Sequence, residues 1–322
     1  MNPVKYSILL PIYNEQENIP LLYKRLTIVM ASITANYEMI FIDDFSTDNS
    51  FKLLEELHET DCRVKILKFT KNNGHQVAIM SGLEYASGEA VVIMDADLQD
   101  PPEILPKFFE KHSEGYDIVY AQREKRAGES LFKLVTAFMF YRVMRFLTNI
   151  EMPLDVGDFR LIDRRVVDSL KSMQERNKFL RGLIGWTGYK QVGITFKRDA
   201  RHAGVTKYSI RKMFKLAFDG VFSFSHVPLR LATVLGLTIS ACSFFLILWT
   251  LFIKYGDGAV IGWSSLMISI LFIGGIQLVT LGIIGEYVGR IYDEVKLRPL
   301  YIIDKKIGFV SRPQEIGQMD KR

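Results

Sequence analysis

Cysteine is scarce in this 322-residue sequence, and two common nucleotide-binding motifs are missing. The only cysteines are Cys62 and Cys242, and Cys242 lies inside a long apolar run, so a disulfide framework is excluded. No Gly-x-Gly-x-x-Gly follows the first apolar segment, and Gly-x-x-x-x-Gly-Lys-Ser/Thr occurs nowhere. These absences argue against a dinucleotide dehydrogenase and against a P-loop nucleotidase.

Charged residues are missing from two long stretches in the last third of the chain. Residues 231–253 and 259–285 contain no Asp, Glu, Lys or Arg, and each stretch exceeds the ~20 residues that a helix needs to cross a membrane. Two buried helices of a soluble core are the alternative, but soluble helices of that length normally carry a polar stripe. We therefore predict two membrane spans.

The first residues lack the features of a secretory signal. Met1-Asn2-Pro3-Val4-Lys5 leads straight into a short apolar segment, without a longer apolar run or a small-residue cleavage site. Lys and Arg exceed Asp and Glu, 41 against 36, and the surplus lies close to the two spans. By the positive-inside rule, we expect both ends in the cytoplasm and the connector at 254–258 outside.

The basic surplus also bears on binding partners. Nucleic acid is one explanation, but anionic lipid explains better a surplus that borders apolar helices, so we expect membrane lipids and no nucleic acid as partners. Residues 210–222 have a basic amphipathic pattern, and residues 131–147 are more apolar with three basic interruptions. Each segment is consistent with a helix in the membrane interface or with an ordinary core helix.

Short apolar segments alternate with helical ones in the first part of the chain. We expect strands at 6–12, 38–43, 64–69, 90–94 and 117–120, with helices such as 17–30 and 51–60 between them. This alternation predicts an α/β fold with a mostly parallel sheet that helices cover on both faces. Ligands of such sheets bind beyond the carboxyl ends of the strands.

The acidic residues after the fourth expected strand are the most informative. Asp95 and Asp97 stand two residues apart where a buried strand ends, and hard oxygen ligands of this kind suit Mg²⁺ or Mn²⁺. A divalent cation there would neutralise the charge that develops on a leaving nucleoside diphosphate. A turn with solvated charges is the alternative, but the position after the fourth strand favours the metal.

Polar residues also follow the first two expected strands. One carboxylate of the pair at 43–44 is a candidate acceptor for a base N–H, and residues 46–48 are candidate caps for the next helix. His75 and the other four histidines show no metal-ligand spacing. We expect these histidines to be structural or surface groups.

Six motifs spread along the chain carry a specific resemblance. They are Pro11-Ile12-Tyr13-Asn14-Glu15, Asp43-Asp44, Asp95-Ala96-Asp97-Leu98-Gln99-Asp100-Pro101-Pro102, Gly157-Asp158-Phe159-Arg160, Gly204-Val205-Thr206-Lys207-Tyr208 and Gly285-Glu286-Tyr287-Val288-Gly289-Arg290. In this combination the chain resembles family 2 glycosyltransferases that act on polyprenyl phosphates, in the bactoprenol glucosyltransferase branch related to dolichyl-phosphate mannose synthase. The resemblance covers nearly the whole chain and implies a Rossmann-like GT-A fold, a cytoplasmic catalytic domain and inversion at the anomeric carbon.

The resemblance also implies roles for individual residues. The implied nucleotide-sugar site, with the base, ribose and diphosphate, consists of Pro11, Tyr13, Glu15, Asp44, Asp95 and Arg123. The implied metal ligands are Asp95, Asp97 and Gln99. The implied contacts to the acceptor phosphate are Lys133, Arg201 and Lys207. Phe45 departs from the small residue usual after the Asp pair, so we expect that loop to be shaped differently.

The expected catalytic residues are Asp97, Asp158 and Gln99. A lipid monophosphate has a second pKa of about 6 and is largely dianionic at neutral pH, so it needs little help from a general base. Positioning and charge stabilisation by the metal and by Arg or Lys should then dominate. Asp158 either orients the acceptor or acts as a base, and a buried partner of Arg160 or of another cation is the alternative.

The resulting functional prediction is an inverting hexose transfer from a UDP-sugar to undecaprenyl phosphate, with glucose as the first choice. N-acetylglucosamine or another sugar remains an alternative. A processive polysaccharide synthase usually carries more spans and a Gln-x-x-Arg-Trp motif, which is absent here. A catalytically silent scaffold disagrees with the intact acidic motifs.

We expect four regions and a multi-pass protein of the bacterial inner (cytoplasmic) membrane. The regions are a GT-A domain at 1–200, a basic juxtamembrane segment at 201–227, a two-helix hairpin at 228–290 and a cytoplasmic tail at 291–322. The resemblance also makes a homo-oligomer the expected assembly.

Overall fold

The computed structural model describes residues 4–123, 156–173, 175–176, 179–196, 227–257 and 262–309. The chain divides into two compact units, which are described separately: Met1–Tyr141, Ile150–Ser209 and Pro299–Arg322 form the first, and Arg142–Asn149 and Ile210–Arg298 form the second. Outside the described residues lie Lys133, Arg201, Lys207, the basic amphipathic segment 210–222 and the more apolar segment 131–147.

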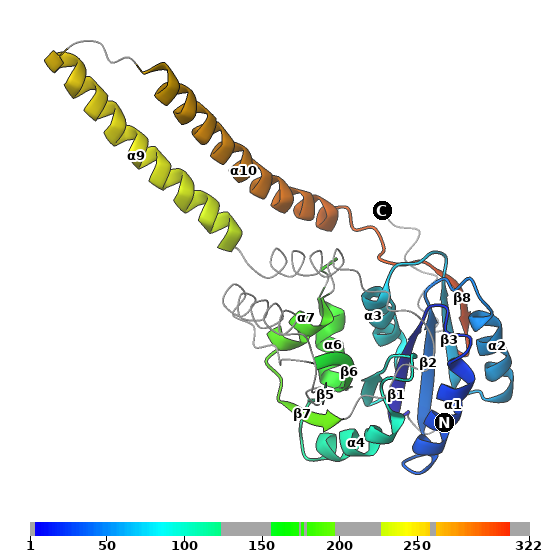
Figure 1. Cartoon of the computed structure of the whole chain (residues 1–322). Coiled ribbons are helices and arrows are strands. Elements are labelled where there is room, and N and C mark those ends of the chain that lie inside the picture. Colours follow the sequence, from blue (N-terminus) through cyan, green and yellow to red (C-terminus); the bar gives the residue numbers. More distant parts are fainter. Residues whose placement is uncertain are drawn as a thin grey trace, which may run out of the picture. The chain divides into compact units, whose positions relative to one another are not determined.

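The first unit is built on a mixed sheet with the strand order β7-β5-β6-β4-β1-β2-β3-β8 (Figure 1). Its strands are β1 (Tyr6–Ile12), β2 (Tyr37–Asp43), β3 (Val64–Phe69), β4 (Ala90–Ile93), β5 (Ile118–Arg123), β6 (Val156–Asp163), β7 (Gln191–Phe196) and β8 (Ile303–Ile307). Strands β4, β1, β2 and β3 are parallel to one another, whereas β6 is antiparallel to β4 and β5. The predicted α/β fold with a mostly parallel sheet is confirmed.

Helices cover both faces of this sheet. The helices of the first unit are α1 (Ile19–Ala31), α2 (Ser50–Thr60), α3 (His75–Tyr85), η1 (Pro102–Ile104), α4 (Leu105–Ser113), α6 (Arg164–Ser172) and α7 (Leu180–Trp186). Helices α1, α2 and α4 share one buried cluster with the sheet, while α3 packs on β1 and β2 elsewhere. Gly82 allows α3 to approach closely, since a Cβ there would lie 2.9 Å from the Ile42 side chain.

Strand β8 has no local sequence pattern that predicts it. It lies in the segment 291–322, which was expected to be a tail, and it pairs antiparallel with β3 at the sheet edge. Tyr301, just before the strand, stacks on Phe69 with ring centroids 5.1 Å apart and donates a hydrogen bond to Glu84. Burial, followed by this contact with Glu84, raises the pKa of Tyr301. Strand β8 thus covers the edge that β3 would otherwise leave unpaired.

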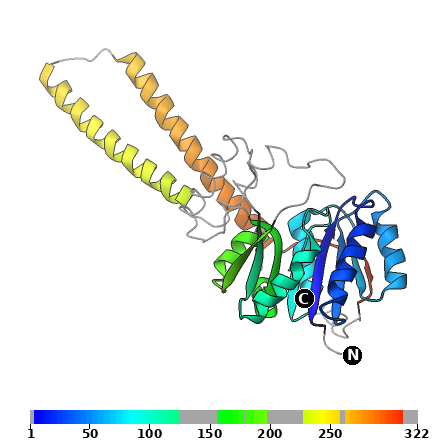
Figure 2. The ribbon, with the colours of Figure 1, turned by 60° about the horizontal axis from the view of Figure 1, so that its bottom comes forward.

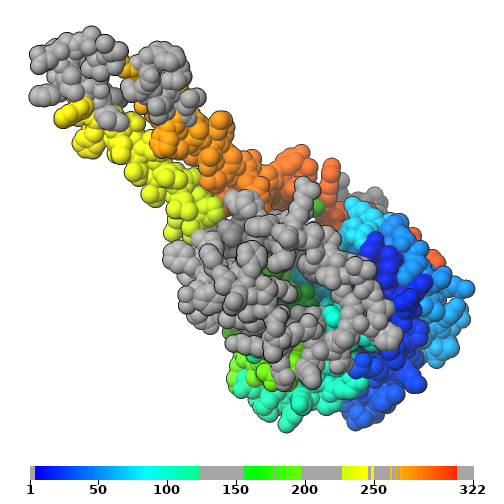
Figure 3. All heavy atoms as spheres, viewed as in Figure 1, coloured from blue at the N-terminus to red at the C-terminus, as the bar shows by residue number. Residues whose placement is uncertain are grey.

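The second unit is a hairpin of two long helices, α9 (Val227–Asp257) and α10 (Trp263–Val295), which lie side by side in Figure 2. Two segments, Val227–Phe245 and Phe272–Val295, are long and apolar enough to cross a membrane, and almost none of their residues is buried. In the space-filling view of Figure 3, the coloured side chains of both helices are visible on the outside of the molecule. A soluble core helix would bury its apolar side chains, so the hairpin indicates membrane association.

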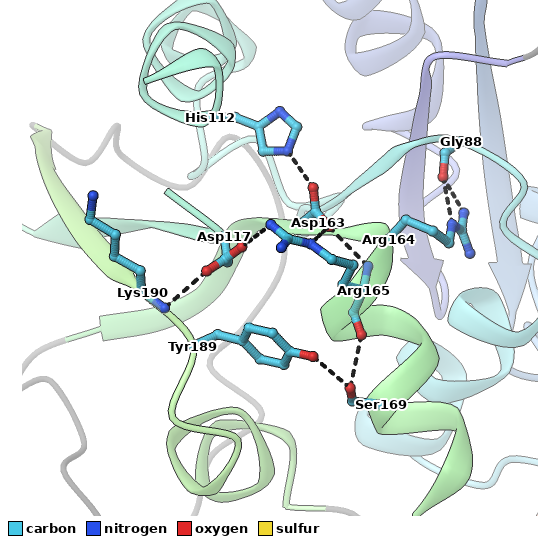
Figure 4. Close-up of polar contacts among 9 residues, drawn as sticks. All are labelled: Gly88, His112, Asp117, Asp163, Arg164, Arg165, Ser169, Tyr189 and Lys190. Atoms are coloured by element: carbon cyan, nitrogen blue, oxygen red, sulfur yellow. Dashed lines mark hydrogen bonds and ion pairs between the residues drawn. The ribbon is translucent and has the colours of Figure 1, made fainter. Parts of the chain in front are cut away.

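A polar cluster ties the amino end of β5 to the carboxyl end of β6 (Figure 4). Asp163 accepts hydrogen bonds from His112 at 2.9 Å and from the backbone N–H of Arg165 at 2.9 Å. The Arg165 guanidinium also reaches Asp117 at 2.5 Å. Burial opposes ionisation of Asp163, but these bonds outweigh it and lower the pKa of Asp163. Because β6 is antiparallel to β4, Asp163 pairs with Ala90 at the amino end of β4. The cluster therefore lies at the opposite end of the strands from the carboxyl end of β4.

Candidate active site

The loops after β1 and β2 are joined by a series of hydrogen bonds at the carboxyl edge of the sheet. Asn14 N–H donates to Ser46 Oγ at 3.0 Å, and Asn14 Oδ1 accepts from Thr47 N–H at 2.8 Å. Further along, Gln16 N–H donates to Asp48 Oδ2 at 3.3 Å. Ser46 and Thr47 therefore bind the neighbouring loop, while Asp48 also accepts from the N–H of Ser50, the first residue of α2. The N-cap of α2 is Asn49, which makes no side-chain cap bond, so the expectation that Ser46, Thr47 or Asp48 caps the helix is wrong, although Asp48 binds the first N–H of α2.

Asp44 holds the loop that leads into α3. Its carboxylate accepts hydrogen bonds from the N–H groups of Asn73 at 2.7 Å and Gly74 at 2.9 Å, and the residue is only 4% exposed. Burial raises the pKa of Asp44, although the two backbone bonds work in the other direction. Asp44 thus fixes the start of α3 and, with it, the position of His75.

Two carboxylates face each other across β4 and β6. Ile93 pairs with Arg160 in the antiparallel register, so Asp95 follows β4 at the level of Asp158. Like charges directly opposite on neighbouring strands are destabilising. His75 compensates them, since its Nε2 atom lies 3.5 Å from Asp95 Oδ1 and 3.3 Å from Asp158 Oδ2.

His75 gains positive charge from this position. Its side chain is 36% exposed, and partial burial alone would lower its pKa. The carboxylates of Asp95 and Asp158 outweigh that effect and raise the pKa of His75 to about 9. The imidazole is therefore a cation at neutral pH, and it links a residue expected to bind the nucleotide with one expected to serve the acceptor.

Asp158 is held by further partners from α3 and α7. Arg181 Nε donates to Asp158 Oδ1 at 2.8 Å, and Gln76 Nε2 donates to Oδ2 at 3.1 Å. Gln76 also accepts from the N–H of Leu180 at 3.2 Å, which ties the two helices together. Burial would raise the pKa of Asp158, but Arg181 and His75 hold it well below its usual value. Asp158 is thus an ionised carboxylate in a cationic setting.

The residues expected to hold a metal form a tight turn after β4. Asp95, Asp97 and Gln99 are all half-buried, and the N–H of Gln99 donates to Asp97 Oδ1 at 3.1 Å. Among the described residues, no group of three His, Cys, Asp or Glu side chains is gathered for a metal. Mg²⁺ commonly uses only one or two carboxylates together with substrate phosphates and water, so this donor set fits such an ion.

The other expected nucleotide-binding residues stand at the same edge or near it. Pro11 is half-buried near the end of β1, and Tyr13 follows it with 37% exposure. Glu15 is half-buried, and its Oε2 accepts a hydrogen bond from Asn18 Nδ2 at 2.6 Å. Arg123 is the last residue of β5.

Three residues of the cluster were not singled out from the sequence. His75, Gln76 and Arg181 surround Asp158, yet His75 was expected to be structural or on the surface. No local motif marks them, because α3 and α7 meet only in the folded chain. The one available indication was Asp158 itself, a carboxylate in an apolar strand that requires a cationic partner.

Comparison with known proteins adds an independent line of evidence. The family model for Glycosyl transferase family 2 matches residues 7–171. The uncharacterized glycosyltransferase YkcC of Bacillus subtilis (strain 168) is 49% identical, over 96% of this chain and 96% of that protein. The SfII prophage-derived bactoprenol glucosyl transferase of Shigella flexneri is 40% identical, over 94% of this chain and 98% of that protein.

A solved structure is similar as well. Glucosyl-3-phosphoglycerate synthase from Mycobacterium tuberculosis, in complex with Mn²⁺, UDP and phosphoglyceric acid, is 19% identical with a TM-score of 0.47, over 68% of this chain and 76% of that chain. The family match covers about half of the chain, and the relatives align over nearly their full length. The chain therefore belongs to glycosyl transferase family 2.

Proposed function

We propose that this protein transfers a hexose, with glucose favoured, from a UDP-sugar to undecaprenyl phosphate with inversion at the anomeric carbon. The observation that carries the proposal is the contact of His75 with both Asp95 and Asp158. The imidazole of His75 thus contacts both a residue of the candidate diphosphate site and the candidate acceptor residue. A relative with 40% identity bears the name bactoprenol glucosyl transferase, which agrees with a lipid-phosphate acceptor.

In this proposal the donor binds along the carboxyl edge of the sheet. Pro11, Tyr13 and Asp44 serve the base, Glu15 lies near the donor, and Arg123 meets a phosphate. Asp95, Asp97 and Gln99 would hold Mg²⁺ or Mn²⁺, and the ion when bound would neutralise the charge of the departing diphosphate. Asp97 and Gln99 contribute to catalysis through that role.

Asp158 acts by positioning in this proposal. A carboxylate whose pKa is lowered by Arg181 and His75 is a weak base, so it is poorly suited to remove a proton. The acceptor makes this unnecessary, since a phosphate monoester is largely dianionic at neutral pH. A phosphate oxygen attacks the anomeric carbon, the bond from that carbon to the diphosphate breaks, and UDP leaves with the electron pair.

The hairpin supplies access to a lipid acceptor. We propose that α9 and α10 span the bacterial cytoplasmic membrane, with the sheet unit on the cytoplasmic side. The four regions 1–200, 201–227, 228–290 and 291–322 then serve as catalytic domain, juxtamembrane segment, hairpin and tail, with β8 returning to the sheet. Lys133, Arg201 and Lys207 would contact the acceptor phosphate, and a homo-oligomer is the proposed assembly.

An assay of lipid product formation tests the proposal. Purified full-length protein with radiolabelled UDP-glucose, Mg²⁺ and undecaprenyl phosphate should yield a labelled product that extracts into organic solvent. Asp97→Ala should lower the rate by about 100-fold or more. Asp168→Ala is a matched control, because Asp168 is an exposed residue of α6, and it should keep the wild-type rate.

Two outcomes would contradict the proposal. The reaction class is wrong if no nucleotide sugar gives a lipid product and Asp97→Ala binds UDP as the wild type does. The choice of sugar is wrong if UDP-N-acetylglucosamine reacts with a higher kcat/KM than UDP-glucose under the same conditions.

A further inference from the structure

Phe45, directly after the Asp pair of β2, has a backbone conformation that bulky residues rarely adopt. Its φ angle is +66°, and it is one of four described non-glycine residues with positive φ. Asn14 and Leu98 are two of the others, and they follow β1 and β4 at the same sheet edge. Asn tolerates this region, whereas for a large side chain it is a genuine outlier. Such strain often persists where a ligand site requires it.

Packing does not explain why a phenylalanine occupies this position. The side chain is 44% exposed, so burial contributes little to holding it there. The backbone on either side is fixed by polar contacts: Asn72 Nδ2 donates to the Asp44 carbonyl at 3.2 Å, and Ser46 N–H donates to Asp43 Oδ1 at 3.0 Å. The loop thus holds a partly exposed aromatic residue at a position where glycine would be the relaxed choice.

Tyr13 lies across from Phe45 on the neighbouring loop. Asp44 N–H donates to the Ile12 carbonyl at 2.9 Å, and Asn14 N–H donates to Ser46 Oγ at 3.0 Å. Tyr13 lies between Ile12 and Asn14, and Phe45 lies between Asp44 and Ser46. The two hydrogen bonds therefore join the residues on either side of both aromatic residues. Tyr13 is 37% exposed, so two partly exposed aromatic residues occupy opposite positions on adjacent loops, and Phe45 directly follows the buried Asp44.

We infer that Phe45 forms a wall of the nucleobase site and contacts the flat face of the donor base by stacking. This inference rests on the proposed function, which places a UDP-sugar at this edge. Aromatic side chains recognise bases through their faces without reading the hydrogen-bonding edge. Phe45 would add binding area beside Tyr13 and leave the identity of the base to polar groups such as Asp44.

If Phe45 stacks on the base, its removal should weaken UDP binding without lowering the stability of the protein. Phe45→Gly relieves the strained backbone and should leave the melting temperature equal to or above that of the wild type. The same variant should bind UDP about tenfold more weakly, because stacking on one aromatic side chain contributes that much or more. A purely structural role predicts the opposite for stability.

Calorimetric titration of the full-length protein with Mg²⁺ and either UDP or inorganic pyrophosphate tests the inference. We expect Phe45→Gly to weaken UDP binding and to leave pyrophosphate binding unchanged, while Phe45→Trp keeps the wild-type affinity for UDP. Ile28→Ala is the matched control, since Ile28 is an apolar residue of α1 with 64% exposure, and it should bind both probes as the wild type does.

Three results would overturn the inference, and a fourth would separate it from the proposed reaction. Unchanged UDP affinity in Phe45→Gly shows that the ring does not contact the base. An equal loss of UDP and pyrophosphate affinity, or a fall in melting temperature, shows that Phe45 only shapes the loop. If the wild type binds pyrophosphate but not UDP, the proposed donor is wrong and this inference falls with it. If UDP binding weakens only in Phe45→Gly while lipid transfer fails in the wild type, the base contact stands and the proposed reaction does not.

Discussion

Charge compensation around Asp158 determines what this carboxylate can do. His75, Gln76 and Arg181 occupy its two oxygen atoms, so the group is fixed and ionised. His75 contacts Asp95 as well, which makes it the residue that separates two like charges on neighbouring strands. Its role in the proposed reaction is to position those carboxylates.

We predict that His75→Ala lowers kcat/KM for lipid glycosylation by about 10- to 100-fold, the usual effect of losing a residue that orients metal ligands. The reason is that Asp95 and Asp158 then repel each other without a cation between them. His75→Lys keeps a positive charge and should retain more activity than His75→Ala. Steady-state rates with the UDP-sugar varied at saturating acceptor give kcat/KM for each variant, and equal values for His75→Ala and the wild type would refute this role.

Glu38 is a buried carboxylate at the other end of the sheet, and it offers a test by pH. It is 1% exposed and accepts hydrogen bonds from Ser7 Oγ at 2.5 Å, from Ser87 N–H at 2.8 Å and from Lys65 Nζ at 2.5 Å. Burial alone would raise its pKa, but Lys65 and the two serines outweigh burial and lower the pKa of Glu38. The ionised form is therefore the one that stabilises the fold.

We predict that Glu38→Gln destabilises the protein at pH 7 by about 3 kcal/mol, because Lys65 loses a buried partner. A lowered pKa in the folded state means that the contribution is present above about pH 4.3, the usual pKa of Glu, and is lost as the pH falls through the folded pKa. Thermal unfolding in detergent between pH 7 and pH 3 should show the difference from wild type shrinking. Glu114→Gln is the control, since its pair with Lys111 is exposed. A difference that stays constant with pH would contradict the assignment.

Among the elements, β8 has the largest consequence for the sheet. It gives β3 a partner strand, and Lys305 adds an ion pair to Glu55 at 3.1 Å. Without it, β3 would present an open edge with unpaired backbone groups, and such edges favour aggregation.

We predict that a chain ending after Leu300 aggregates and melts at least about 5 °C below the wild type, since it loses β8 and the stacking of Tyr301 on Phe69. A chain ending after Val310 keeps both and should behave as the full-length protein does. Size-exclusion chromatography and thermal unfolding in detergent measure the two quantities. A monodisperse chain ending at Leu300 with an unchanged melting temperature would show that β8 is dispensable.

The strands that the sequence predicts well are those with a local pattern. β1, β2, β3 and β4 are apolar runs with polar or Gly/Pro boundaries, and the structure places their ends within one residue of expectation. β8 reads Ile-Asp-Lys-Lys-Ile, which is polar, short and paired with a strand far away in the sequence, so no local pattern marks it. No local pattern marks His75 either, because its partners lie after β4 and within β6.

Some residues of the candidate site can also be recognised from a local sequence pattern, and others cannot. Asp95, Asp97 and Asp44 are visible in the sequence because each follows an apolar strand, and parallel strands bring such residues to one edge. Arg181 is one basic residue among many, and only the packing of α7 brings it to Asp158. The roles of Lys133, Arg201 and Lys207 stay predictions, as does the assignment of each nucleotide-binding residue.

On the scale of the whole molecule, the proposed orientation in the membrane can be measured. In a background with Cys62→Ser and Cys242→Ser, we predict that Asp257→Cys, at the end of α9, reacts with a membrane-impermeant maleimide in intact cells. Asp304→Cys, in β8, should react only after the cells are permeabilised, because the positive-inside rule places both chain ends in the cytoplasm. Labelling of Asp304→Cys in intact cells would reverse the proposed orientation.

The return of the chain to the sheet has a consequence for the order of synthesis. β8 pairs with β3, yet the ribosome makes β8 long after β3, and both helices of the hairpin are made in between. Domains generally fold as they leave the ribosome, but this sheet keeps an open edge until the hairpin has been translated. Strand β8 can therefore join the sheet only after both helices of the hairpin have been synthesised.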